Sequence, residues 1–102
     1  MLIPEITYTF AEVALPFASN LTPGDHALLL VLGEHDAREE LVWVQVTECL
    51  QASTYRARTV RGAECFPDLP AGEVVYFRPE HVVQVRPCGA HSLLSLSGAV
   101  LA

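Results

Sequence analysis

Apolar residues along this chain fall into short runs that predict β-strands rather than helices. In the segment 41–50, Val42, Val44 and Val46 alternate with Trp43 and with polar residues. A period of two is typical of a strand with one buried face, so we expect the three valines to point into the core. Trp43 then lies on the outer face of the sheet. Because it is large and apolar, another part of the chain or a partner should cover it.

The run of apolar residues at 27–32 shows no alternation. Because it is short and is bracketed by turn residues, it predicts a strand that is covered on both faces rather than a helix. We assign Leu28, Leu30 and Leu32 to the core side of this strand. The assignment depends on the register, since a slip of one residue would exchange the two faces.

The segment 72–86 predicts the end of a small barrel. Residues 73–78 and 82–86 have the composition of strands, and residues 79–81 between them predict a single 3₁₀ turn. We therefore expect a mostly β fold, a small SH3-like and partly open barrel of five or six strands. Its core should also include Val75, Phe77, Val83 and Val85.

The length of 102 residues is that of a single domain. We expect residues 1–21 to form an N-terminal strand and a connection, residues 22–87 to form the barrel, and residues 88–102 to form a tail. The tail has too many large apolar residues for an ordinary solvated segment, so we expect it to pack on the barrel or on a second copy of the chain. Its candidates for self-association are Leu93, Leu94, Leu96, Val100 and Leu101.

Charge and cysteine content narrow the class of protein. The net charge is −6, and the acidic residues are concentrated in the first half of the chain. An acidic chain repels a phosphate backbone, which disfavours nucleic acid as a partner. The three cysteines include no C-x2-C pair, the N-terminus lacks the features of a secretion signal, and no apolar run approaches the ~20 residues of a membrane span. We therefore expect a soluble cytoplasmic protein.

Residue types that serve catalysis and metal binding are present, but their spacing does not match a known kind of site. His81, Cys88 and His91 are close in the sequence, yet the paired spacing of zinc ligands is missing. The sequence contains no glycine-rich phosphate loop and no nucleophile elbow. We expect Cys49, at the end of a strand, to be a small buried residue. The sequence therefore predicts no enzyme activity, no metal and no cofactor.

Arg56, Arg58 and Arg61 form a basic cluster. Arg56 and Arg58 should project from the same side of a strand, where with Trp43 or Tyr76 they could contact single-stranded nucleic acid. The alternative is a solvated strand face whose arginines pair with acids and keep the edge soluble. The negative charge of the whole chain favours the second interpretation.

Two blocks of the sequence resemble a family of small bacterial domains of unknown function. The first is an acid, Glu40, three residues before W-V-x-V-T at 43–47, and the second is G-x-x-V-x-F-x-P-E-H-V at 72–82. Some members of this family resemble immunity proteins that are encoded beside polymorphic toxins. The resemblance covers residues 22–86 and implies a compact mostly β domain with no established catalysis and a role in binding another protein. The Asn-x-Pro that relatives commonly carry after the third strand is absent at 62–67.

We therefore expect a non-catalytic protein-binding module, an immunity or adaptor protein that acts through surface complementarity. Aromatic and arginine anchors with a charged rim are typical of such contacts. The predicted anchors are Trp43, Tyr55, Arg56, Arg58, Tyr76 and Arg78, and the predicted acidic rim is Glu34, Asp36, Glu39 and Glu40. One alternative is a self-associating structural subunit that uses the C-terminal tail. A weaker alternative is a nucleic-acid-binding SH3-like module that uses the arginines at 56, 58 and 61.

Overall fold

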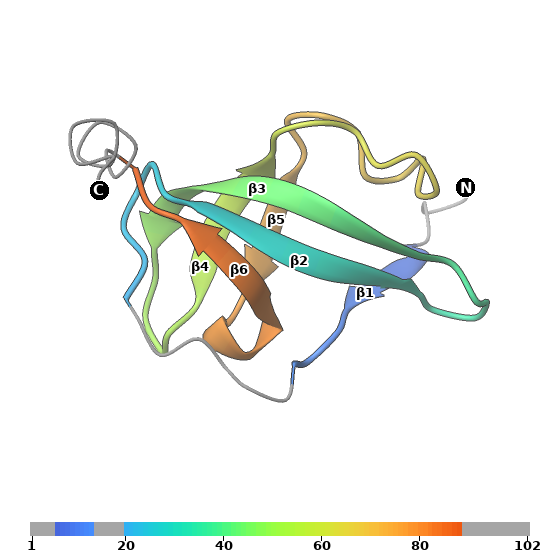
Figure 1. Ribbon diagram of the computed structural model, residues 1–102, viewed down its shortest axis with the longest axis horizontal. Coiled ribbons are helices and arrows are strands. Elements are labelled where there is room, and N and C mark those ends of the chain that lie inside the picture. The colour runs from blue at the N-terminus through green and yellow to red at the C-terminus, as the bar shows by residue number, and fades with distance from the viewer. Residues whose placement is uncertain (1–5, 14–19, 89–102) are drawn as a thin grey trace, which may run out of the picture.

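Six antiparallel strands form one sheet that curls into an open half-barrel (Figure 1). The computed structural model describes residues 6–13 and 20–88. Its strands are β1 (Tyr8–Phe10), β2 (His26–Gly33), β3 (Glu39–Cys49), β4 (Tyr55–Thr59), β5 (Val74–Phe77) and β6 (Val82–Arg86), and the 3₁₀ turn η1 (Pro79–His81) separates β5 from β6. The prediction of a mostly β, partly open, SH3-like barrel with one 3₁₀ turn is confirmed.

Strand β2 is the centre of the sheet because it pairs with three other strands. One of its edges pairs with β3 along most of the strand. The other edge is shared, since its first half pairs with β6 and its second half pairs with β1. Strand β4 pairs with β3, and β5 pairs with β4. Strands β1 and β5 therefore lie at the two ends of the path β1-β2-β3-β4-β5.

The inward face of β3 carries its three alternating valines, as predicted. Residues directly opposite each other in an antiparallel pair share a face of the sheet. Ala27 lies opposite Val44, and Leu29 lies opposite Val42. The buried face of β2 is therefore formed by Ala27, Leu29 and Val31.

The prediction that Leu28, Leu30 and Leu32 face the core is wrong. The register with β3 turns these residues to the outer face of the sheet. Leu28 is nevertheless buried there, opposite Trp43, and Leu30 and Leu32 are half-buried. The run at 27–32 thus has cover on both faces, which accounts for its lack of alternation.

The prediction that Val83 is buried is also wrong. The pairing of β6 with β2 is irregular between Leu28 and Leu29, and this shift places Val82 in the core while Val83 is 43% exposed. Val85 is partly buried and packs against the core, as predicted. One irregular step in the ladder therefore changes which valine of a Val-Val pair points inward.

The loop between β4 and β5 supplies two core residues that strand alternation does not reveal. Phe66 and Leu69 are fully buried and belong to the same core as Val75 and Phe77, whose burial was predicted. The Leu69 N–H donates to the Phe66 carbonyl at 2.9 Å, which holds both side chains on the inner side of the loop.

Asp25 joins the start of the barrel to its end. It is 6% exposed, and its Oδ1 accepts from the Cys88 N–H at 2.7 Å. Its Oδ2 accepts from the Thr22 N–H at 2.9 Å and from the Thr22 hydroxyl at 3.2 Å. Burial opposes the charged form of Asp25, but the hydrogen bonds outweigh burial, so the pKa of its carboxyl lies below the ordinary value of 3.8.

We expect Asp25→Asn to lower the free energy of unfolding by about 1–3 kcal/mol, because an amide cannot accept from all three donors. Since the pKa is lower in the folded state than in the unfolded state, the stabilisation is complete above about pH 4 and is lost as the pH falls through the folded pKa. Urea unfolding measured at several pH values should therefore show a steeper loss toward acid in the wild type than in the variant.

Glu34→Gln is the matched control for this prediction, because it makes the same chemical change at an exposed position in the loop after β2. It should unfold like the wild type at every pH. Equal stability of Asp25→Asn and the wild type near neutral pH would contradict the role of Asp25.

Candidate protein-binding face

The structure distributes the predicted anchors over several places. Trp43 is half-buried on the outer face of β3. Arg56 and Arg58 lie on the outer face of β4, and Tyr76 lies opposite Arg56 on β5. Tyr55 is different, because it is buried in the core and packs against the ring of Phe77. Its side chain is therefore not accessible as a surface anchor.

Trp43 is covered in part by the barrel itself. Leu28 lies opposite it on β2, and the guanidinium of Arg86 lies over the indole, with 4.8 Å between Cζ and the ring centroid. A guanidinium over a tryptophan ring is a cation–π contact worth about 0.5–1 kcal/mol at an exposed site. The cover that the sequence requires for Trp43 thus comes partly from the end of β6.

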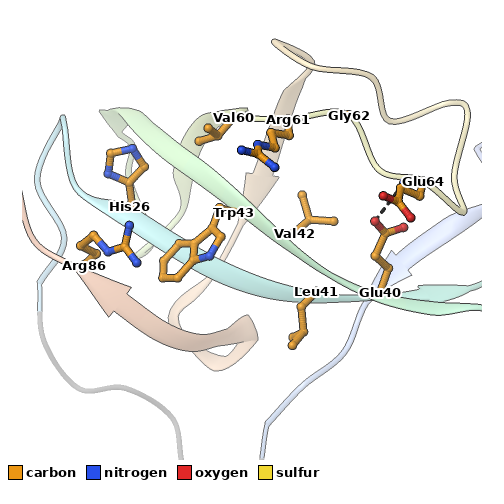
Figure 2. A pocket seen from close by; sticks show the side chains of 10 residues that line it. All are labelled: His26, Glu40, Leu41, Val42, Trp43, Val60, Arg61, Gly62, Glu64 and Arg86. Atoms are coloured by element: carbon orange, nitrogen blue, oxygen red, sulfur yellow. Dashed lines mark hydrogen bonds between the residues drawn. The ribbon is translucent and has the colours of Figure 1, made fainter.

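A groove of about 470 Å³ runs along the outer face beside Trp43 (Figure 2). Leu41 on β3 and Val60, directly after β4, both line it and are both exposed. The Val60 N–H donates to the Trp43 carbonyl at 3.0 Å, which continues the β3–β4 ladder beyond the end of β4. The middle of the groove therefore presents apolar surface on a rigid backbone. We call the whole groove the Trp43 groove.

Charged side chains lie at both ends of the Trp43 groove. Figure 2 shows His26 and Arg86 together at one end, and Glu40 and Glu64 together at the other. Arg61 lies between these two ends, on the wall formed by the loop after β4. The groove therefore has a basic end and an acidic end.

Glu40 has a structural role at the acidic end of the groove. Its carboxylate accepts from the backbone N–H groups of Glu64 and Cys65 at 2.9 and 2.8 Å. Hydrogen bonds to a charged acceptor are stronger than neutral ones, so Glu40 ties the loop after β4 to the start of β3. The acid three residues before Trp43 thus fixes one wall of the groove and is not a free rim charge.

The hairpin between β2 and β3 carries the rest of the predicted acidic rim. Glu34 and Glu39 are exposed. Asp36 is paired with Arg38, whose Nε lies 2.9 Å from Asp36 Oδ1, and the hydrogen bonds from Arg38 lower the pKa of the Asp36 carboxyl. Arg38 also donates to the Cys65 carbonyl at 2.7 Å. This hairpin is therefore fastened to the loop after β4, and its unpaired charge lies on Glu34 and Glu39 among the residues that the structure describes.

The arginines on β4 and after β5 are engaged within the chain. Arg56 and Arg78 form ion pairs with nearby glutamates at 3.3 and 2.9 Å, and Arg58 donates to a backbone carbonyl at 2.9 Å. Within residues 6–13 and 20–88, Arg61 and Arg86 form no ion pair, and both line the Trp43 groove. The basic groups that are most available to a partner are therefore Arg61 and Arg86.

The sequence does not predict the contribution of His26 and Arg86 to this face. The two residues lie opposite each other in the pairing of β2 with β6. This pairing joins segments that are far apart in the chain, and no local pattern signals it. The predicted self-association residues Leu93, Leu94, Leu96, Val100 and Leu101 lie outside the described residues.

Comparisons with models of protein families, with curated proteins and with solved structures give no match. In the described ranges, no helix is long and apolar enough to cross a membrane.

The three cysteines, Cys49, Cys65 and Cys88, are free and exposed. The predicted burial of Cys49 is wrong, because the pairing of β3 with β4 shifts register after Val46 and the last residues of β3 are exposed. Among residues 6–13 and 20–88, no group of three or more His, Cys, Asp or Glu side chains is placed to hold a metal ion.

Trp43 is the only tryptophan of the chain, so fluorescence that is excited selectively at tryptophan reports on the candidate face alone. We expect Arg86→Ala to uncover the indole, to shift its emission to longer wavelength and to increase acrylamide quenching about two-fold, because the cation–π cover is lost. Arg78→Ala, which removes an arginine elsewhere, is the matched control and should leave the emission unchanged. Identical quenching of the wild type and both variants would contradict the contact.

Proposed function

We propose that this chain is a non-catalytic protein-binding module of the immunity or adaptor type, which recognises its partner through the Trp43 groove. The observation that carries the proposal is the combination in one groove of a half-buried tryptophan, exposed apolar residues and two arginines that form no ion pair with any of the described residues. Binding hot spots are enriched in tryptophan and arginine. The resemblance to domains related to immunity proteins supports the same function.

The chemistry of the groove suits a partner that offers an apolar side chain between charges of opposite sign. Leu41 and Val60 can bury apolar surface of the partner, and Arg86 and Arg61 can pair with its carboxylates. Glu64, at the other end, favours a basic residue. Such an arrangement fixes the orientation of the partner and speeds its encounter more than it adds affinity.

The positions of the arginines give little support to nucleic-acid binding as the main function. Arg56 and Arg58 have partners within the chain, and Arg61 lines the wall of the Trp43 groove instead of extending the row on β4. The net charge of −6 further opposes a polyanion. Self-association through the C-terminal tail is a second candidate function, which the experiment below separates from partner binding.

The proposal is tested by capturing a partner with the purified full chain and then titrating the purified partner by calorimetry. We expect Trp43→Ala combined with Arg61→Ala to weaken binding about 100-fold, since truncation of each anchor should cost about 1–2 kcal/mol. Both substitutions remove exposed or half-exposed atoms of the outer face, so the fold should survive, and circular dichroism checks that it does.

Leu50→Ala is the matched control, because it truncates an exposed apolar residue outside the groove, and it should change the affinity less than about two-fold. Unchanged affinity in the double variant would reject the Trp43 groove as the binding site. Light scattering on the free chain tests the second candidate: an oligomer that dissociates when residues 89–102 are removed, which keeps the contact of Cys88 with Asp25, would favour self-association.

A further inference from the structure

The two ends of the strand path cannot complete the barrel by antiparallel pairing with each other. Each step from β1 through β2, β3 and β4 to β5 is antiparallel. After four such steps, β5 runs in the same direction as β1. A single additional strand between them, running in the opposite direction, would be antiparallel to both and would make the barrel antiparallel throughout.

The edge of β5 that faces away from β4 carries unpaired backbone groups. The Thr59 N–H donates to the Glu73 carbonyl at 3.0 Å. In an antiparallel ladder, every second residue of a strand forms its backbone hydrogen bonds with the neighbouring strand on that side. Val75 and Phe77 therefore bond β4, whereas the N–H and C=O groups of Val74 and Tyr76 point away from it. These groups have no hydrogen-bond partner among the described residues.

The outer edge of β1 has the same character. The Ala11 N–H donates to the Leu30 carbonyl at 2.9 Å, and the Glu34 N–H donates to the Thr7 carbonyl at 2.8 Å. By the same alternation, Thr9 bonds β2, and the backbone groups of Tyr8 and Phe10 point away from it. Strands β1 and β5 thus present two unpaired edges in the part of the chain that the structure describes.

Contacts at both ends hold these edges in place. At one end, Asp68, in the loop before β5, accepts from the Thr7 N–H at 2.8 Å and from the Thr7 hydroxyl at 3.0 Å. At the other end, the Val13 N–H donates to the Glu80 carbonyl in η1 at 2.8 Å. Between these contacts, β1 and β5 do not pair. The space between them is therefore preformed and need not be opened by a ligand.

The space between the two edges is a groove of about 410 Å³, which we call the β1–β5 groove. Its lining includes Ile6 and Tyr76, which are 63% and 55% exposed, and the partly buried Val74. Large apolar side chains left this exposed beside unpaired backbone groups are typical of a surface that receives an extended peptide.

One end of the β1–β5 groove is acidic. Glu73 lines the groove and is exposed, and Asp68 lies close to the same end. Burial and then the charges of Asp68 and Glu73 raise the pKa of the Tyr8 hydroxyl, which places both carboxylates near that ring. A basic side chain of a ligand would be favoured at this end.

We propose that the β1–β5 groove accepts one extended segment of a partner protein, which runs antiparallel to β5 and bonds the backbone of Val74 and Tyr76. The segment has apolar residues at alternate positions, of which one faces Tyr8 and Val75. It carries arginine or lysine at its C-terminal end, because an antiparallel segment ends beside Glu73. This inference rests on the proposed function only in that the ligand is a protein, since its surface is separate from the Trp43 groove.

The geometry favours a lone extended segment over a second copy of this chain. A strand that already belongs to a sheet carries its neighbours with it, and the contacts of Thr7 with Asp68 and of Val13 with Glu80 close the groove to such a sheet. A segment without neighbours has both edges free and can satisfy the unpaired groups on either side.

The experiment uses the full chain and two synthetic heptapeptides blocked at both ends. The first is Thr-Val-Ser-Val-Thr-Arg-Arg, and the second replaces both arginines with glutamate. Amide hydrogen exchange by NMR should show fast exchange at Val74 and Tyr76 in the free chain. Saturation with the first peptide should slow both amides at least about 10-fold. The amides of Val75 and Phe77, which bond β4, should exchange slowly in both states.

Two substitutions test the site. Val74→Pro removes an outward N–H at the first residue of an edge strand, where proline is tolerated, and should weaken binding of the arginine peptide at least about 10-fold. Val74→Ala keeps the N–H and is its matched control, with a change below about three-fold. Glu73→Arg should reverse the preference between the two peptides. Slow exchange at Val75 and Phe77 verifies that each variant remains folded.

Several outcomes would overturn the proposal. These are the absence of binding by either peptide, equal binding to Val74→Pro and Val74→Ala, and protection of the Val74 and Tyr76 amides already in the free chain. The last result would mean that the chain itself or a second copy fills the groove. Trp43→Ala should bind the arginine peptide as the wild type does, so failure of this inference and failure of the proposed function are distinguishable.

Discussion

The pairing of β2 with three strands is the constraint on which the rest of this structure depends. Strand β3 occupies one edge of β2, and β6 and β1 divide the other edge between them. The register with β3 sets the inward face, because Ala27 lies opposite Val44 and Leu29 lies opposite Val42. A slip of one residue would bury the other set of side chains and would destroy both the core and the outer face.

The same register creates the candidate site. With Ala27 and Leu29 inward, Leu28 must face outward, and it meets Trp43 on the outer side of the sheet. Strand β6 then brings Arg86 over the indole. An apolar outer face would ordinarily be an aggregation hazard, and here the cation over the ring and the charged ends of the groove reduce that hazard while leaving Leu41 exposed. The features that we assign to recognition are therefore consequences of how the core is built.

Sequence patterns predict those parts of this fold in which alternation is visible. The valines of β3, the residues of β5 and the turn at 79–81 follow from local periodicity and turn chemistry. The inward face of 27–32 could not be predicted, because a continuous apolar run shows no alternation. The register with β3 alone decides which of its residues face the core. The prediction that Val83 is buried was wrong for a related reason, since an irregular step in strand pairing cannot be recognised from the amino-acid composition. At the candidate site, the position of Trp43 on the outer face was predicted. The contribution of Arg86 was not, because it depends on the pairing of β6 with β2, two segments that are far apart in the sequence.

The two surfaces of this chain differ in the chemistry that each can use for recognition. The Trp43 groove offers side chains, so its selectivity would depend on the shape and charge of the partner. The β1–β5 groove offers backbone donors and acceptors, which any extended segment can satisfy, so its selectivity would depend on alternate side chains and on Glu73. An unprotected edge invites pairing between copies. The edges here lie between the Thr7–Asp68 and Val13–Glu80 contacts, and these contacts obstruct a folded sheet more than a single extended strand.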